Sequence, residues 1–269
     1  MTIDNGGRGG TNTPVPVLTS YYDLTITGGA QVVLGGQTTS VPLGTLLITS
    51  NSWLICTNLS ATLLNVSNNA TIQAGGGILL DGYGYGGGAG TGAGHVATTN
   101  GILTGSGGGY GGMGGPSLAG APGGISYGSF SEPTLPGSGG GNTTGTSPYN
   151  LGGAGGGALE LTVTGTLALD GRISANGLTA VGVASGGGSG GSLWVRTGKL
   201  TGKGSFSANG GAGDFPYGGG GGGGRIFLQP TGTQVTNPFS GVFSARGGAG
   251  AIAGAAGTIY IVPYHLNTA

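Results

Sequence analysis

The sequence predicts an all-β fold: a parallel β-helix (β-solenoid) with glycine-rich loops packed against it. Short apolar segments recur at a nearly constant spacing, and within each segment apolar and polar residues alternate as in a half-buried strand. Glycine supplies 72 of the 269 residues and disfavours helix throughout. Short strands that repeat at a fixed period are typical of solenoids, where each coil buries its inward side chains against its neighbours.

The recurrence is clearest in the C-terminal part. Four strand-like segments each follow a glycine run, and their starts are almost evenly spaced, at Ala158, Ser192, Arg225 and Thr258. A second motif recurs inside the units as GRISANG from Gly171, GSFSANG from Gly204 and GVFSARG from Gly241. A flexible linker has no reason to keep such a register, so residues 158–269 are predicted to be solenoid repeats of about 33 residues.

The preceding part of the chain divides into three regions. Residues 1–18 have an extended, proline-punctuated composition that predicts an N-terminal arm or capping strand. Residues 19–81 are predicted to be β-coils with polar turns, since TLLITSNS from Thr45 recurs as TLLNVSNN from Thr62, at about half the later period. Residues 82–157 form a region rich in glycine and tyrosine.

This glycine- and tyrosine-rich region admits two interpretations. Glycine-rich chains are usually flexible, and each glycine opposes ordering by ~0.5–1 kcal/mol relative to alanine. Extended glycine segments can, however, lie side by side as polyglycine-II-like helices whose N–H and C=O groups bond laterally. The regular loop lengths and the interspersed tyrosines favour this second arrangement, so we expect residues 82–157 to pack in order on the solenoid.

Charge and cysteine content argue against several classes of function. Seven acidic and seven basic residues balance, and charged residues make up 5% of the chain, which leaves no electrostatic footprint for nucleic acid or an anionic membrane. No stretch approaches the about 18 apolar residues of a membrane span, and no signal peptide is visible. Cys56, the single cysteine, is expected to be a small buried hydrophobe. Neither a cofactor nor a metal site is predicted.

Five segments in a fixed order resemble a known module. They are GSGGG at 137–141, GGAGGGALEL at 152–161, LALDGRISANG at 167–177, GGGSGGSLWV at 186–195 and GGGGGGRIFL at 219–228. Residues 92–228 thereby resemble the glycine-rich module of large bacterial surface proteins and of plant glycine-rich membrane-anchored proteins. The resemblance implies an extracellular, β-helical module of a multidomain protein and brings no catalytic residues. By composition alone, the chain is also similar to the glycine-rich receptor-binding tips of phage tail-fibre adhesins, which would place it on a virion.

Two aspartates share a motif, Asp81 in LLDG and Asp170 in ALDG, and could approach each other on one face. Glycoside hydrolysis needs such a carboxylate pair. However, Lys203 aligns with Asp170 in the next repeat, and stacked equivalents lie about 4.8 Å apart. A structural ion pair between Asp170 and Lys203 is therefore the simpler interpretation, and no catalytic residue is expected.

Asparagine recurs at the turn after the second motif. Asn176 and Asn209 occupy equivalent positions of successive repeats, and Arg246 follows at the next repeat. Stacked side-chain amides can satisfy each other's donors and acceptors. We therefore predict a structural ladder of Asn176 and Asn209 that ends at Arg246.

Six tyrosines in glycine-rich loops are candidates for a binding surface. A phenol ring offers an apolar face and a polar hydroxyl, which suits a glycan or a surface receptor. The alternative is that these rings are packing spacers between glycine segments. The six are Tyr83, Tyr85, Tyr110, Tyr127, Tyr149 and Tyr217.

Together these features predict a non-enzymatic structural or adhesive module of an extracellular or cell-surface assembly. Self-association into a homo-oligomer or filament is expected through the N-terminal arm and the open solenoid ends, since near-zero net charge does not oppose it. Two alternatives stay open. One is an adhesin that binds a host receptor or a glycan, and the other is a β-helix carbohydrate-active enzyme.

Overall fold

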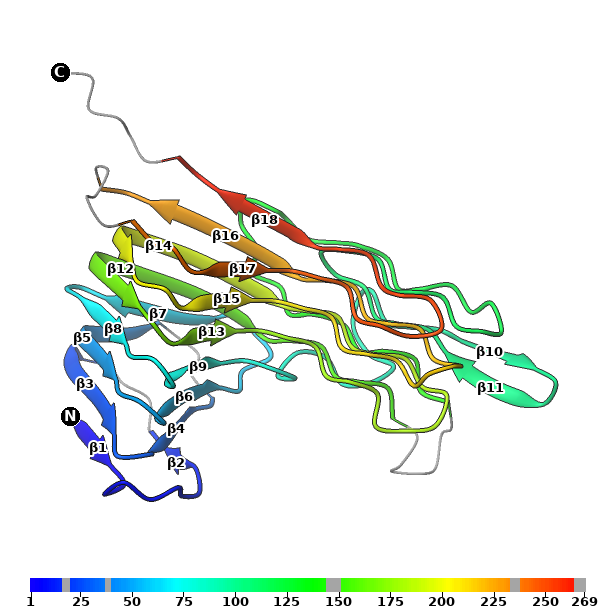
Figure 1. Ribbon diagram of the computed structural model, residues 1–269, viewed down its shortest axis with the longest axis horizontal. Helices are drawn as coiled ribbons and strands as arrows, with labels where there is room; N and C mark the ends of the chain where they lie inside the picture. Colours follow the sequence, from blue (N-terminus) through cyan, green and yellow to red (C-terminus); the bar gives the residue numbers. More distant parts are fainter. Residues whose placement is uncertain (16–19, 37–39, 144–150, 233–237, 264–269) are drawn as a thin grey trace.

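Two sheets of parallel strands and one hairpin make up the regular structure of the computed structural model (Figure 1). It describes residues 1–15, 20–36, 40–143, 151–232 and 238–263. Within these ranges the chain contains strands and no helix, so the predicted all-β class is confirmed. Accordingly, the described residues include no helix of the length and apolarity needed to cross a membrane.

The first sheet has nine strands in the order β1-β3-β5-β7-β12-β14-β16-β18, with β8 beside β5 and β12. Its strands are β1 (Thr2–Asp4), β3 (Tyr22–Thr27), β5 (Val41–Ile48), β7 (Thr62–Val66), β8 (Ala70–Ile72), β12 (Ala158–Leu169), β14 (Ser192–Thr201), β16 (Arg225–Pro230) and β18 (Thr258–Ile261).

The second sheet has seven strands in the order β17-β15-β13-β9-β6-β4-β2. Its strands are β2 (Thr13–Pro14), β4 (Gln31–Leu34), β6 (Trp53–Cys56), β9 (Gly77–Leu79), β13 (Arg172–Ser174), β15 (Ser205–Ser207) and β17 (Val242–Ser244). The hairpin consists of β10 (Val96–Thr99) and β11 (Ile102–Gly105), which are antiparallel.

The chain visits the two sheets alternately, and neighbouring strands within each sheet are parallel. Each coil therefore adds one layer to both sheets, an arrangement consistent with a β-solenoid-like fold. We call the two sheets and their direct connections the two-sheet base. Figure 1 shows the base at the left, with the N-terminus on that side.

Alternate side chains of the strands form one apolar core between the sheets. In β12, Leu159, Leu161 and Val163 are buried, whereas Glu160 and Thr162 lie on the outer face. The second sheet contributes its own buried residues to the same core, including Cys56, which is a free thiol. The alternation of apolar and polar residues that predicted the strands therefore also identifies the side chains that point into the core.

The C-terminal repeats stack in the register that their sequence alignment predicted. Ala158 lies opposite Ser192, Ser192 opposite Arg225, and Arg225 opposite Thr258. The second motif is likewise aligned, through β13, β15 and β17.

The short repeat predicted for residues 19–81, with Thr45 and Thr62 at equivalent positions, is wrong. TLLITSNS supplies the end of β5, where Leu46 pairs with Ala70 of β8, and the start of β5 pairs with β7, where Val41 lies opposite Leu64. Each coil is therefore longer than the interval between the two similar segments. They lie in the same sheet but at different points of their coils.

The N-terminal residues pair with strands of the same chain and form its first coil. Strand β1 pairs with β3, and β2 pairs with β4, so residues 1–15 cover one end of the base. This agrees with a capping strand and argues against an arm donated to another subunit. Residues 16–18 of the predicted arm lie outside the described residues.

Glycine-rich segments leave the second sheet after β9, β13, β15 and β17 and return to the first sheet, side by side (Figure 1). We call these segments the glycine bundle, which comprises residues 82–143, 151–157, 175–191, 208–224 and 245–257. Backbone hydrogen bonds join neighbouring segments at every third residue. Gly187 and Gly190 donate to the carbonyl oxygens of Gly219 and Gly222, and Gly177 and Ala180 donate to those of Asn209 and Ala212.

The segments of the bundle approach too closely for side chains. A Cβ atom built on Gly190 would overlap the carbonyl oxygen of Ala208, and one on Gly221 would overlap that of Gly188. The described part of residues 82–157 belongs to the same network. Gly108, for example, donates to Gly187 and accepts from Gly222.

Candidate functional site

The glycine bundle ends, away from the base, in a set of turns that we call the tip (Figure 1). The tip consists of the β10–β11 hairpin and the turns at 116–122, 179–184, 213–218 and 249–253. Each turn joins the outgoing and the returning part of a segment, so the hydrogen-bonded glycine backbone on both sides determines where the turn lies.

Hydrogen bonds connect neighbouring turns of the tip. The Asp214 carboxylate accepts from the Ala184 N–H at 2.6 Å, and the Asp214 N–H donates to the Ser185 carbonyl at 3.0 Å. The Leu118 N–H donates to the Tyr217 carbonyl at 2.9 Å.

The hairpin is attached to the same network. The Gly105 N–H donates to the Ala184 carbonyl at 2.7 Å, and the Thr104 hydroxyl donates to the Ser117 hydroxyl at 2.8 Å. The tip is therefore a preformed surface rather than a set of independent loops.

Apolar side chains project from these turns into solvent. Phe215, Val181 and Val183 expose 77%, 71% and 69% of their surface. Four more apolar residues of the tip are also exposed: Val96, Ile102, Leu118 and Ile252. Exposed apolar residues that cluster at one end of a molecule mark interaction sites in soluble proteins.

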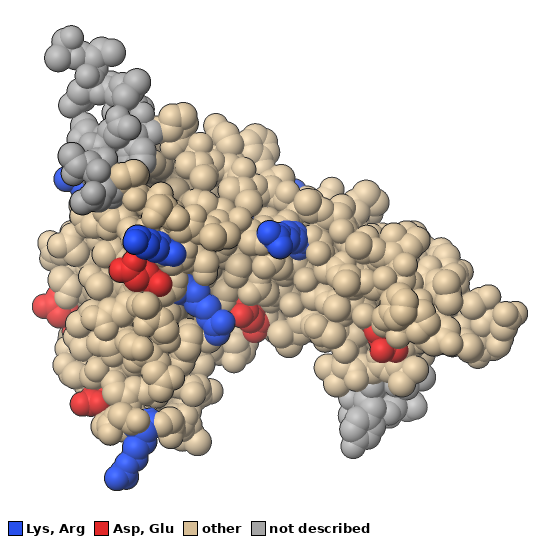
Figure 2. Space-filling view, viewed as in Figure 1, with Lys and Arg blue, Asp and Glu red and all other residues tan. Residues whose placement is uncertain are grey.

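The tip carries almost no charge. Asp214 is the one charged residue in its turns; its carboxylate accepts from the Ala184 N–H, and its carbonyl accepts from N–H groups of its own turn. Figure 2 shows that most charged groups on the displayed face lie over the two-sheet base. The tip thus offers mainly apolar area and backbone groups, with Asp214 as its one charged side chain.

Tyr110 does not belong to a binding surface, contrary to one of our expectations. It is fully buried, and its hydroxyl lies 2.6 Å from the Ser192 hydroxyl oxygen. Burial raises the pKa of Tyr110 above its usual value. Its ring packs edge-on against Tyr127, with 4.8 Å between the centroids.

Tyr127 is also a packing residue. Its hydroxyl donates to the Pro136 carbonyl at 2.7 Å and lies 2.8 Å from the Ser138 hydroxyl. Burial raises the pKa of Tyr127 to about 12. The guanidinium of Arg225 donates to the Tyr127 carbonyl at 2.8 Å and lies over the Tyr110 ring, 5.4 Å from its centroid. The Tyr110 hydroxyl and the Tyr127 carbonyl therefore join the bundle to Ser192 and Arg225 of the first sheet.

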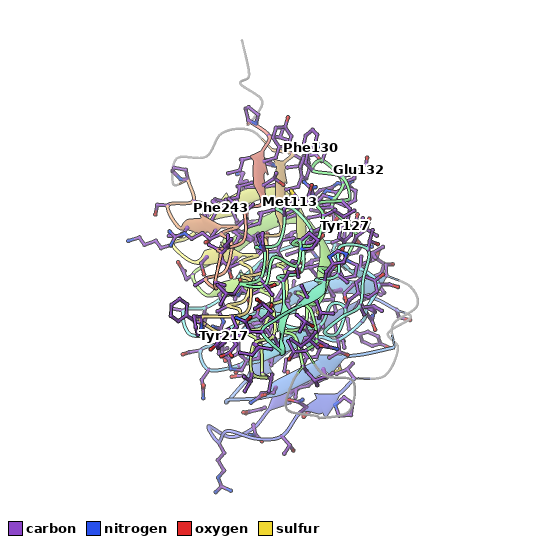
Figure 3. All side chains as sticks on the ribbon, turned by 90° about the vertical axis from the view of Figure 1, so that its right-hand side faces the viewer. Met113, Tyr127, Phe130, Glu132, Tyr217 and Phe243 are labelled. Carbon is purple, nitrogen blue, oxygen red and sulfur yellow. The ribbon has the colours of Figure 1, made fainter. Side chains whose placement is uncertain are left out.

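The other tyrosines are dispersed. Tyr83, Tyr85 and Tyr217 are half-buried, and Tyr149 lies outside the described residues. In Figure 3, which views the molecule from the tip, Tyr217 and Tyr127 lie well apart. With Tyr110 buried and Tyr217 apart from Tyr127, the five described candidates do not form one exposed surface.

The asparagine row exists, but its side chains bond backbone N–H groups and not the amide stack that we expected. The Asn176 side-chain oxygen accepts from the Asn209 N–H, and the Asn209 side-chain oxygen accepts from the Arg246 N–H, each at 2.8 Å. Each amide thus bonds the backbone of the next coil rather than the next amide. The row begins one coil earlier than predicted, because the Asp81 carboxylate accepts from the Asn176 N–H at 2.6 Å.

The carboxylate alignment was wrong. Asp81 follows β9 in the second sheet and aligns with Asn176, whereas Asp170 precedes β13, so the two do not occupy equivalent positions. The predicted Asp170–Lys203 ion pair is also absent from the described structure. Instead, the Asp170 carboxylate accepts from the Lys203 backbone N–H at 3.0 Å. Across the described ranges, the ion pair found joins Arg196 and Glu160, 3.4 Å apart.

Sequence reasoning missed the apolar tip, although a signal was present. Val181 and Phe215 are separated by the same interval as Ala158 and Ser192, which is one coil, and each is followed by a glycine run. Residue type alone does not distinguish these positions, because single exposed apolar residues are common on protein surfaces.

No protein family, curated protein or solved structure matches this sequence. The described residues likewise hold no group of three or more His, Cys, Asp or Glu side chains that could bind a metal ion.

Proposed function

We propose that the two-sheet base is a parallel β-helix and that the glycine bundle is polyglycine-II-like. The alternation of the chain between two parallel sheets supports the first assignment. Hydrogen bonds at every third residue support the second, since a polyproline-II-type helix has three residues per turn. In this arrangement the base acts as a support, and the bundle is a stiff extension that holds the tip away from it.

On this scaffold, the chain functions as a non-enzymatic adhesive module of an extracellular or cell-surface assembly, and its tip makes the contact. The observation that carries this function is the group of exposed apolar side chains on mutually hydrogen-bonded turns, with Phe215, Val181 and Val183 the most exposed. A preformed apolar surface loses little conformational entropy on binding.

The chemistry of the tip selects the class of partner. Aliphatic side chains provide no hydrogen-bond donors or acceptors for sugar hydroxyls, and Asp214, whose carboxylate already accepts from the Ala184 N–H, is the one charged residue of the described turns. An uncharged, apolar patch on a partner protein is the complementary surface.

Adsorption to octyl-coated beads tests this function. We expect the double variant Val181→Ser/Phe215→Ser to retain less than half of the adsorption of the unmodified chain. Val242→Ser, which changes an exposed valine of the base, is the matched control and should adsorb normally. Equal adsorption of the tip variant and the unmodified chain would refute the tip as the adhesive surface.

Self-association is a second candidate function, supported by the C-terminal edge of the base. Ile259 and Ile261 align with the core residues Ile226 and Leu228, yet each exposes 43% of its surface. An uncovered edge strand with inward apolar side chains can accept another strand. Light scattering at increasing concentration should show association that Ile259→Lys abolishes, whereas a constant monomer mass for the unmodified chain would exclude it.

A further inference from the structure

A groove of about 810 Å³ lies where the two-sheet base meets the glycine bundle. Its volume falls within the range of small-molecule sites, which favour junctions between structural units. The base contributes residues 58–61 together with Leu63 and Glu160, and the bundle contributes Tyr85 and residues 134–136. Glu160 lies beside Leu63 in the first sheet and points to its outer face.

The walls of the groove are fixed by hydrogen bonds. Both backbone polar groups of Tyr85 are hydrogen-bonded. Its N–H donates to the Gly137 carbonyl at 3.0 Å, and its carbonyl accepts from the Gly155 N–H at 2.8 Å. On the opposite wall the Asn58 side-chain oxygen accepts from the Gly36 N–H at 2.8 Å. The Leu135 carbonyl accepts from the Ser192 hydroxyl. A ligand would therefore meet a largely preformed site.

The lining combines apolar faces with a few polar groups. Leu59, Leu63 and Leu135 are exposed apolar side chains. The half-buried ring of Tyr85 lies among them, and its hydroxyl makes no hydrogen bond to another described residue. Glu160 supplies a carboxylate acceptor that is already paired with Arg196, 3.4 Å away.

This pattern matches the two-sided chemistry of a sugar ring. The C–H face of a sugar packs on aromatic and aliphatic side chains, and its hydroxyl groups need acceptors and donors at the edge. The Glu160 carboxylate would repel a negatively charged sugar. A neutral sugar meets no such repulsion from the paired Glu160 and Arg196.

We propose that the groove between Tyr85 and Glu160 binds a neutral saccharide. The Tyr85 ring and the adjacent leucines cover the apolar face of the sugar, and the Tyr85 hydroxyl and Glu160 carboxylate bond its hydroxyl groups. This site is separate from the tip and adds a second, polar specificity to an adhesive module.

Titration of the full chain with neutral disaccharides (maltose, cellobiose and lactose), followed by ligand-detected NMR, tests the proposal. We expect saturable binding of at least one of them, weakened at least about tenfold by Tyr85→Ala. Tyr85→Phe keeps the ring and should retain binding within a few-fold. Tyr83→Ala is the matched control, because Tyr83 is close in sequence to Tyr85 and does not line the groove.

The acidic disaccharide digalacturonate tests the role of Glu160. We expect the unmodified chain to prefer neutral disaccharides and Glu160→Gln to reduce that preference. Leu63→Ser is a second groove variant on an outward position of the base and should also weaken binding. No saturable binding, or equal binding by Tyr85→Ala and the unmodified chain, would overturn the proposal.

The adhesive tip and the saccharide groove can be refuted independently of each other. Val181→Ser/Phe215→Ser should bind disaccharide normally, and Tyr85→Ala should adsorb to octyl-coated beads normally. A loss of saccharide binding in the tip variant would contradict a site in the groove.

Discussion

The two-sheet base and the glycine bundle reach order by opposite means. In the base, side chains such as Leu54 and Leu161 fill a common core and are fully buried. In the bundle, segments meet backbone to backbone, and Gly190 is surrounded so closely that a Cβ would overlap the Ala208 carbonyl. The base therefore depends on side-chain atoms being present, and the bundle depends on their absence.

This difference also explains why the coils of the two regions differ in length. In the N-terminal coils, paired strand residues such as Val41 and Leu64 are closer in sequence than Ser192 and Arg225 in the C-terminal coils. The additional residues of the longer coils leave the base and enter the bundle. A longer coil thus extends the molecule sideways without changing how its strands stack.

Removing side-chain atoms should have its largest effect in the base. Leu54→Ala leaves a cavity in the core, and we expect the free energy of unfolding to fall by about 2–5 kcal/mol. Chemical denaturation measures this loss. Leu59→Ala, at an exposed position of the base, should change stability by less than about 0.5 kcal/mol, and similar losses at both sites would contradict a side-chain core.

Adding one carbon atom should destabilise the bundle. Gly190→Ala forces its segment away from the Ala208 carbonyl, and we expect a loss of about 1–3 kcal/mol. Gly86→Ala is the matched control, because a Cβ there meets no atom within 4 Å. Thermal denaturation of the two variants compares them directly, and a neutral Gly190→Ala would show that the segments are less closely packed.

The side-chain row that crosses the coils lies where the two regions meet. Asn209→Ala removes the acceptor of the Arg246 N–H and of the Ser244 hydroxyl, so we expect a loss of about 1–2 kcal/mol. Asn209→Asp keeps an acceptor, as Asp81 does at the start of the row, and should lose less. If both variants lost equally in chemical denaturation, the acceptor would not be the stabilising feature.

High pH should weaken both regions while leaving stability at neutral pH unchanged. Burial raises the pKa of Tyr127 from 10.0 to about 12, and that of Cys56 from 9.0 to about 12. Because each group ionises more readily in the unfolded chain, its contribution is complete below the unfolded pKa and is lost as pH rises toward 12.

Melting temperatures between pH 8 and pH 12 measure this decline. Tyr127→Phe should flatten it on the bundle side, and Cys56→Ala should flatten it in the base. An unchanged decline in both variants would assign it to other groups.

The sequence predicted the base better than the bundle, for a physical reason. Strands reveal themselves by alternation, and the repeats from Ala158 to Thr258 align without ambiguity. The N-terminal coils were misaligned because two similar TLL segments lie in one sheet at different points of their coils.

The site was harder to predict because glycine carries no pattern of its own. Which segments lie side by side depends on backbone bonds between distant residues, such as Gly108 with Gly187. The burial of Tyr110 and the exposure of Phe215 follow from that packing rather than from their residue types. The groove beside Tyr85 likewise joins parts of the chain that no local pattern relates.

Amide hydrogen exchange of residues 175–191 and 208–224 tests the central claim most directly. If the glycine bundle is ordered by its backbone, the N–H groups of Gly187, Gly190 and Gly222, which bond neighbouring segments, should exchange far more slowly than in an unstructured glycine-rich peptide. Exchange of these amides at the rate of an unstructured peptide, while the strands of the base stay protected, would contradict an ordered bundle.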